Sequence, residues 1–75
     1  MLNARKAARH YLKTCSRPDY DAAIYAAKLT PIQAKILNLY ILDNLSIYEI
    51  AFRLDFCESL IRRRLAEVYD KVANL

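Results

Sequence analysis

The chain contains no glycine in 75 residues, and this absence constrains its fold more than any other feature. Glycine most readily supplies the positive φ angles of tight turns, so a sheet built from short hairpins is disfavoured. The composition agrees, because 56% of the residues are hydrophobic and many of them are the helix formers Ala and Leu. We therefore predict an all-α fold, a single small domain of about five helices spanning residues 1–75.

The same sequence disfavours an enzyme. At this size only about 60% of the surface of the unfolded chain can be buried, which leaves little room for a large catalytic pocket. No Ser, Cys or Lys nucleophile has a histidine at motif spacing, and a phosphate loop would need glycine. Cys15, Cys57 and His10 are too few for structural zinc, which takes about four ligands. We expect no catalysis, no cofactor and no metal.

The expected location is the cytoplasm. No stretch approaches the roughly 18 apolar residues of a membrane span, so we expect no membrane association. The first 14 residues carry four Lys or Arg and do not resemble a secretory leader. The two cysteines are therefore expected to stay reduced.

Capping signals divide the chain into helices. Thr30-Pro31-Ile32-Gln33 and Ser46-Ile47-Tyr48-Glu49 each place a hydroxyl three residues before a Gln or Glu, which is the pattern of a capping box. Pro18 interrupts the first helix and suits the first turn of the next. Asn44 tolerates the left-handed conformation that often ends a helix. The expected helices cover residues 3–14, 20–28, 31–42, 47–54 and 58–73.

The last two segments have the spacing of a helix-turn-helix, because a short helix, a three-residue link and a longer helix follow one another. Ala51 is small enough to let the two helices approach, and Phe56 is expected to plug the corner between them. The longer helix carries one apolar stripe, which we expect to be buried: Ile61, Leu65, Val68 and Val72. The six tyrosines are spread over every helix, and we expect core positions for them with hydroxyls that reach solvent.

Three pieces of sequence occur in a familiar order: Leu29-Thr30-Pro31-Ile32-Gln33, then Leu45-Ser46-Ile47-Tyr48-Glu49-Ile50-Ala51, then Leu54 with Cys57-Glu58-Ser59-Leu60-Ile61. Together they resemble the promoter-reading fourth region of bacterial sigma-70 factors, and they are also similar to the DNA-binding domain of LuxR-type regulators. The resemblance covers roughly residues 22–72. The sigma-like reading is preferred because a helix precedes Leu29, whereas the LuxR-type domain has a further helix after the recognition helix. The sigma-like resemblance divides the domain into N-terminal helices, residues 1–28, and a helix-turn-helix unit, residues 29–73.

Three positions depart from the pattern of these families. Asp55 stands where they usually have glycine, and we expect it to adopt the left-handed conformation at some cost. Cys57 replaces Ser or Thr and is expected to be a poor N-cap. Leu60 replaces Thr and suits either contact with a thymine methyl or packing against Phe56, of which we expect the packing.

If the apolar stripe of the last helix is buried, its opposite face points outward. A guanidinium offers two parallel donors that fit the O6/N7 edge of guanine. The expected base-contacting residues are Glu58, Ser59, Arg62 and Arg63, and the expected phosphate contacts are Ser46, Arg53 and Arg64. The resemblance implies the same division of roles. The alternative is a solvated face on which the arginines pair with Glu58 and Glu67.

Positive charge is concentrated at the N-terminus, because five cations and no acidic residue occur in the first 17 residues of a chain of net charge +4. An auxiliary basic face is expected from Arg5, Lys6, Arg9 and Lys13. Such a face suits nucleic-acid phosphates or an acidic protein, and it also serves simply to keep a domain in solution.

The sequence thus predicts a transcription regulator that binds double-stranded DNA sequence-specifically. A homodimer would supply two-fold readout, and the residues considered for it are Tyr11, Leu12, Tyr20 and Ile24. The alternative is an adaptor that uses the sigma-like scaffold to bind RNA polymerase or another regulator.

Overall fold

The computed structural model describes residues 3–75, which form five helices and no strand. The helices are α1 Ala4–Thr14, α2 Arg17–Ala26, α3 Pro31–Ile41, α4 Ile47–Leu54 and α5 Glu58–Ala73. The all-α prediction is confirmed.

Local capping explains where the helices begin. Asn3, Ser16, Thr30 and Ser46 each accept a hydrogen bond from a backbone N–H of the first turn that follows. Both predicted capping boxes form, with the side chains of Gln33 and Glu49 accepting in return from the backbone N–H of Thr30 and Ser46. Cys57 makes no side-chain capping bond, as its sulfur led us to expect.

The predicted bounds of the second helix are wrong at both ends. The α2 helix begins at Arg17 rather than at residue 20, because Ser16 caps it and Pro18 fits within its first turn. It ends at Ala26, and Lys28 takes a positive φ of 54° in the link to α3. The left-handed conformations expected at Asn44 and Asp55 are both present, with φ of 55° and 59°.

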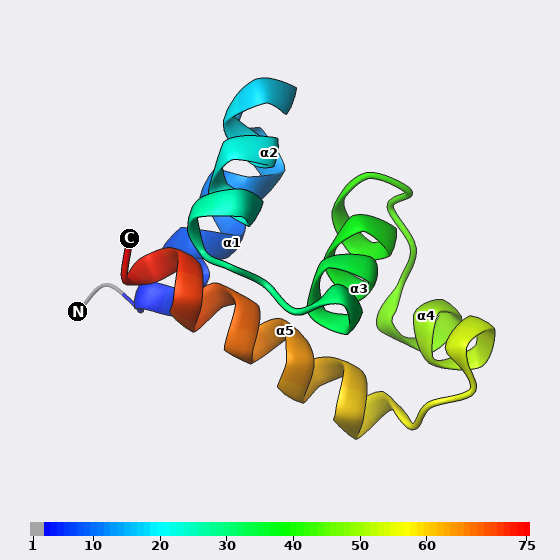
Figure 1. The fold of residues 1–75 in the computed structure, drawn as a ribbon. Coiled ribbons are helices and arrows are strands. Elements are labelled where there is room, and N and C mark those ends of the chain that lie inside the picture. The colour runs from blue at the N-terminus through cyan, green and yellow to red at the C-terminus, as the bar shows by residue number, and fades with distance from the viewer. Residues whose placement is uncertain (1–2) are drawn as a thin grey trace.

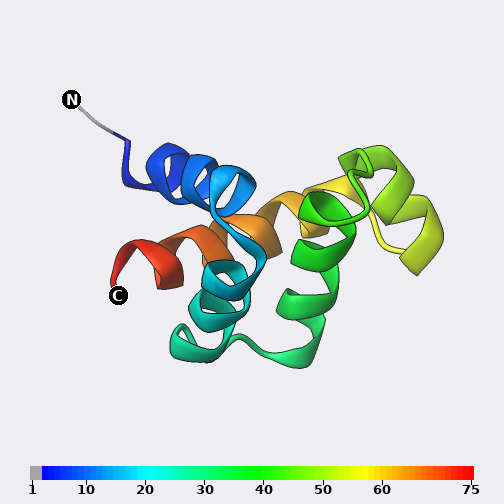
Figure 2. The same ribbon diagram turned by 90° about the horizontal axis from the view of Figure 1, so that it is seen from above.

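The longest helix, α5, is the element on which the others assemble (Figure 1). The α1 helix crosses α5 steeply near its C-terminal end, α3 crosses above its middle, and α4 lies at its N-terminal end. Seen from above, α1 and α2 flank the C-terminal part of α5 on two different sides (Figure 2). Together α1, α3 and α4 therefore cover the buried face of α5 from its N-terminal to its C-terminal end.

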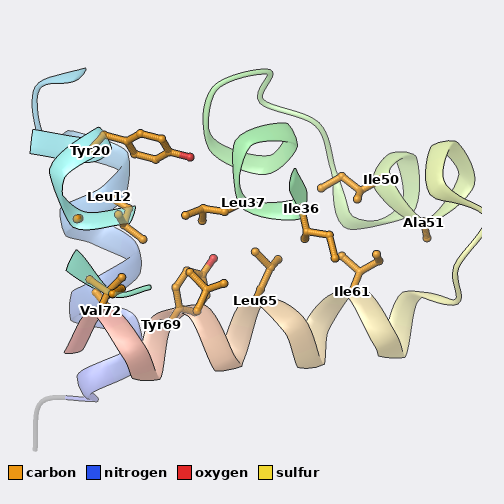
Figure 3. Close-up of a cluster of buried hydrophobic side chains, with 14 residues drawn as sticks. Leu12, Tyr20, Ile36, Leu37, Ile50, Ala51, Ile61, Leu65, Tyr69 and Val72 are labelled. Carbon is orange, nitrogen blue, oxygen red and sulfur yellow. The ribbon is translucent and has the colours of Figure 1, made fainter. Parts of the chain in front are cut away.

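The core forms where these helices meet α5 (Figure 3). The predicted stripe of Ile61, Leu65, Val68 and Val72 is at most 9% exposed. Opposite it are buried residues of the other helices: Leu12, Tyr20, Ile36, Leu37 and Ile50. Burial of such side chains contributes about 1.5–3 kcal/mol each. No helix within residues 3–75 has the length and apolar character needed to cross a membrane.

Candidate nucleic-acid interface

The turn between α4 and α5 sets the orientation of the two helices relative to each other. Asp55 is left-handed, with φ 59° and ψ 42°, and Phe56 donates its backbone N–H to the Ala51 carbonyl at 3.0 Å. Ala51 is 6% exposed, which agrees with its expected place between closely packed helices. Phe56 is 37% exposed, so the expectation that it plugs the corner is only partly met.

The outward face of α5 carries the four residues predicted to contact bases. Glu58, Ser59, Arg62 and Arg63 are all exposed. Arg62 approaches Glu58 at 3.6 Å, one turn earlier on the helix, and both side chains are about half exposed. Such an exposed pair contributes little, so a stronger anion can displace it. Arg63 takes part in no ion pair within residues 3–75.

Arg64 lies on a different side of α5 and is held against α3. Its guanidinium donates to Glu67 at 2.7 Å, and Glu67 also accepts from the Gln33 amide at 3.0 Å. Lys71 donates to the side-chain amide oxygen (Oε1) of Gln33 at 2.8 Å. The hydrogen bonds from Gln33 and Arg64 lower the pKa of Glu67 from its ordinary value of 4.5. The role of Arg64 as a phosphate contact stays a prediction, and the side chain would first have to leave Glu67.

Sequence reasoning missed the position of Gln33. It was assigned only to a capping box, yet it is 5% exposed and joins α3 to α5 through Glu67 and Lys71. Nothing in the local sequence signals this, since its partners lie 34 and 38 residues away.

The two predicted phosphate contacts outside α5 are on or beside α4. Arg53 is exposed and forms no ion pair within residues 3–75. The Ser46 hydroxyl accepts from the Glu49 backbone at 3.1 Å, which leaves its own proton available to donate.

The N-terminal basic helix is packed against the domain. Arg5 forms a two-pronged ion pair with Asp70 of α5, at 2.7 Å and 2.9 Å, and Lys13 lies 4.8 Å from the centre of the Tyr40 ring. Lys6 and Arg9 are exposed. Of the four cations of this auxiliary face, Arg5 is in an ion pair, Lys13 lies over an aromatic ring, and Lys6 and Arg9 are exposed.

Two of the residues considered for a dimer are unavailable. Leu12 and Tyr20 are each 2% exposed, because α1 and α2 use them to cover the core of the same chain. Of that set, Tyr11 is exposed and Ile24 is half-buried.

The expectation for the tyrosines is wrong for five of the six. Tyr11, Tyr25 and Tyr48 are exposed rather than in the core, and the hydroxyls of Tyr20 and Tyr69 do not reach solvent. Tyr20 donates its hydroxyl to the Asn38 side chain at 2.7 Å, and the buried Tyr69 hydroxyl has no hydrogen-bond partner among the described residues. Burial raises the pKa of both phenols to about 12.

Sequence reasoning also missed an aromatic patch, which consists of Tyr48, Phe52 and Phe56. Tyr48 is 65% exposed and Phe52 is 81% exposed, one turn apart on α4. With Cys57 and Glu58 these residues line a shallow hollow of about 460 Å³ beside the start of α5. The spacing of the two α4 rings could have signalled a shared face, but not that this face is left uncovered.

Among residues 3–75, no group of three His, Cys, Asp or Glu side chains is placed to hold a metal ion. The chain matches no protein-family model, and comparison with curated proteins and with solved structures gave no match either.

Proposed function

We propose that this protein is a regulator of transcription that binds double-stranded DNA, with α5 as the recognition helix in the major groove. Arg62 and Arg63 would read guanine, Ser59 and Glu58 would contact neighbouring base edges, and Arg53 would fix the protein on the phosphate backbone. The resemblance of residues 22–72 to the fourth region of sigma factors points the same way.

One observation carries this proposal. The face of α5 opposite its buried stripe is polar, exposed and cationic, and it begins directly after the left-handed turn at Asp55. The alternative of a solvated face accounts for Arg62, which pairs with Glu58, and for Arg64, which pairs with Glu67. It does not account for Arg63, which forms no ion pair within the described residues. In a helix-turn-helix the exposed N-terminal half of the second helix is the part that enters the major groove.

The test is selection of sequences from random duplex DNA at near-physiological salt, with Arg62→Ala/Arg63→Ala in parallel. We expect the wild-type protein to enrich one motif and the double variant to lose it, because each bidentate arginine–guanine contact discriminates by about 1–3 kcal/mol. Thermal unfolding serves as the control for folding, since both side chains are exposed. Equal enrichment by the two proteins would contradict readout by α5. A palindromic motif would indicate a homodimer.

A second candidate function is an adaptor that binds RNA polymerase or another regulator. The aromatic patch favours it, because exposed aromatic side chains that gather on one face commonly mark protein interfaces. Its test is capture of RNA polymerase by the immobilised protein, with Phe52→Ser compared with Arg62→Ala/Arg63→Ala. Loss of capture in Phe52→Ser alone would support the adaptor. If neither Phe52→Ser nor Arg62→Ala/Arg63→Ala retained polymerase, the adaptor would be contradicted.

A further inference from the structure

We infer that the hollow beside the aromatic patch binds an arginine side chain of a partner protein, presented between apolar residues. This site deepens the second candidate function and rests on it, because it names the chemistry by which the partner is recognised. It does not depend on DNA binding by α5. The rings of the aromatic patch supply the apolar part of the site, and two carboxylates beside them supply its charge.

The aromatic patch lies where α4 meets the N-terminal end of α5 (Figure 1). Tyr48 and Phe52 are largely exposed on α4, and Phe56 adds a third, partly exposed ring from the turn. The hollow of about 460 Å³ that these rings line is also lined by the small side chains of Ala51 and Cys57. Large rings around small side chains leave a recess that a single side chain of a partner fits.

The charge of this hollow is negative, although the chain as a whole carries +4. Asp55 and Glu58 line it, and no Lys or Arg among residues 3–75 does. Asp55 takes part in no ion pair within that range. Glu58 is approached by Arg62 at 3.6 Å, an exposed contact that contributes little. The hollow is therefore complementary to a cation.

Arginine matches both features of the hollow at once. Its planar guanidinium stacks on an aromatic face, where the ring quadrupole attracts its charge. Its parallel N–H donors fit a carboxylate such as that of Asp55. Its methylene groups pack against apolar surface while the charged end stays near water. A lysine would meet the same carboxylates only as a point charge and would not stack on the rings.

Charge and position disfavour two other occupants. Aromatic rings also stack on unpaired bases, but the phosphates that accompany those bases would be repelled by Asp55 and Glu58. A second copy of the chain offers Lys6 and Arg9, which are exposed on α1. The α1 helix contacts the other end of α5, so such copies would join head to tail, and contacts of this kind form open chains unless they close into a ring. A different protein is therefore the occupant that we propose.

The first test is a titration of the isotope-labelled protein with a short amidated peptide, in which one arginine lies between leucines, followed by amide NMR shifts. The control peptide has citrulline in place of arginine, which keeps the shape and removes the charge. We expect the arginine peptide to shift the amides of Tyr48, Phe52 and Cys57 saturably. The citrulline peptide should bind about tenfold more weakly, because it loses an exposed ion pair and a cation–π contact together.

Matched variants test the charge and the rings separately. Asp55→Asn removes one charge, and Asn tolerates the φ of 59° at this position. We expect this variant to bind the arginine peptide about two- to fivefold more weakly. Asp43→Asn, which removes the same charge from the link between α3 and α4, should bind as the wild-type protein does.

For the rings, Phe52→Ser is compared with Tyr25→Ser, which removes an exposed ring from α2. We expect Phe52→Ser to weaken binding of the arginine peptide by about tenfold or more, because buried aromatic anchors dominate interfaces. Tyr25→Ser should leave binding unchanged. Thermal unfolding of all four variants is the control for folding, since each substituted side chain is exposed.

Four outcomes would overturn the inference. They are equal binding of the arginine and citrulline peptides, shifts confined to amides away from the turn between α4 and α5, shifts of the turn amides by a single-stranded oligothymidine but not by the peptide, and shifts of the same amides with protein concentration alone. The third would indicate nucleic acid in the hollow, and the fourth a second copy of the chain.

The proposed functions fail by different results. Capture of polymerase that depends on Phe52, by a protein that does not prefer arginine to citrulline, would keep the second candidate function and overturn the arginine site. A protein that captures no polymerase but binds the arginine peptide in the hollow would keep the site and contradict that function. Selection of duplex DNA tests Arg62 and Arg63, which do not line the hollow.

Discussion

A hydroxyl at position 57 should stabilise this protein. Every helix start except that of α5 carries an oxygen that accepts from its first turn. Cys57 has φ −76° and ψ 155°, close to the φ −72° and ψ 163° of Ser46, so its backbone is already in the capping conformation. Cys57→Ser replaces one atom of an exposed side chain and requires no movement of the chain.

The expected gain is smaller than for a usual cap. A good N-cap contributes about 1 kcal/mol relative to a residue that cannot accept. Here the Leu60 backbone N–H, which the new hydroxyl would bind, already donates to the Cys57 carbonyl at 3.1 Å. We therefore expect about 0.5–1 kcal/mol, which corresponds to a rise in Tm of about 2–8 °C for a domain of this size.

The assay is thermal and urea unfolding of Cys57→Ser, with Cys57→Ala as the matched control that lacks the hydroxyl. Ser46→Ala provides the opposite case, because it removes half of a complete capping box and should cost about 1 kcal/mol. Equal stability of the Ser and Ala variants at position 57 would refute the reasoning, since it would mean that the hydroxyl finds no donor there.

Four further substitutions test the packing and the polar contacts. Tyr69→Phe should leave stability unchanged or raise it by up to about 1 kcal/mol, because the lost hydroxyl has no partner, whereas Tyr20→Phe should cost about 1 kcal/mol through its bond to Asn38. Both native phenols have a pKa raised to about 12, so the folded state keeps their protons at a pH where the unfolded state loses them. The free energy of unfolding should therefore fall between about pH 10 and pH 12. Urea titrations at those pH values should show a smaller fall in Tyr69→Phe than in the wild-type protein. The pKa of Glu67 is lowered in the folded protein, so its carboxylate contributes stability at pH values above its ordinary pKa of 4.5. This stability is lost as the pH falls through the pKa of Glu67 in the folded protein. Acid unfolding, followed by circular dichroism, should therefore depend less on pH in Glu67→Gln. Ala51→Leu should destabilise the protein by about 1–3 kcal/mol and weaken DNA binding with it, because the 6% exposed site between α4 and the turn has no room for the added atoms; unchanged stability would show that α4 and α5 are not held closely there.

Local chemistry made much of the fold predictable from sequence. Capping boxes act over three residues, so Thr30 with Gln33 and Ser46 with Glu49 could be located without tertiary information. The buried stripe of α5 was equally visible, because one apolar face at helical spacing must turn away from water. The candidate base contacts lie on the opposite face of the same helix. The start of α2 was misplaced because Ser16 was not recognised as its N-cap, although Pro18 was expected to suit the first helical turn.

Only the tertiary structure decided how the helices use their other faces. The pairing of Arg5 with Asp70 joins residues 65 apart, and no sequence pattern links them, because a charge at helical spacing shows which face it is on but not what covers that face. The same holds for Gln33, which the packing of α3 on α5 buries, and for Phe52, which α4 leaves 81% exposed. Sequence thus determined the helices and the inward face of α5, since these follow from interactions within a few residues. Which surfaces remain for a partner followed from long-range packing, where the free energy depends on neighbours that are distant in the chain.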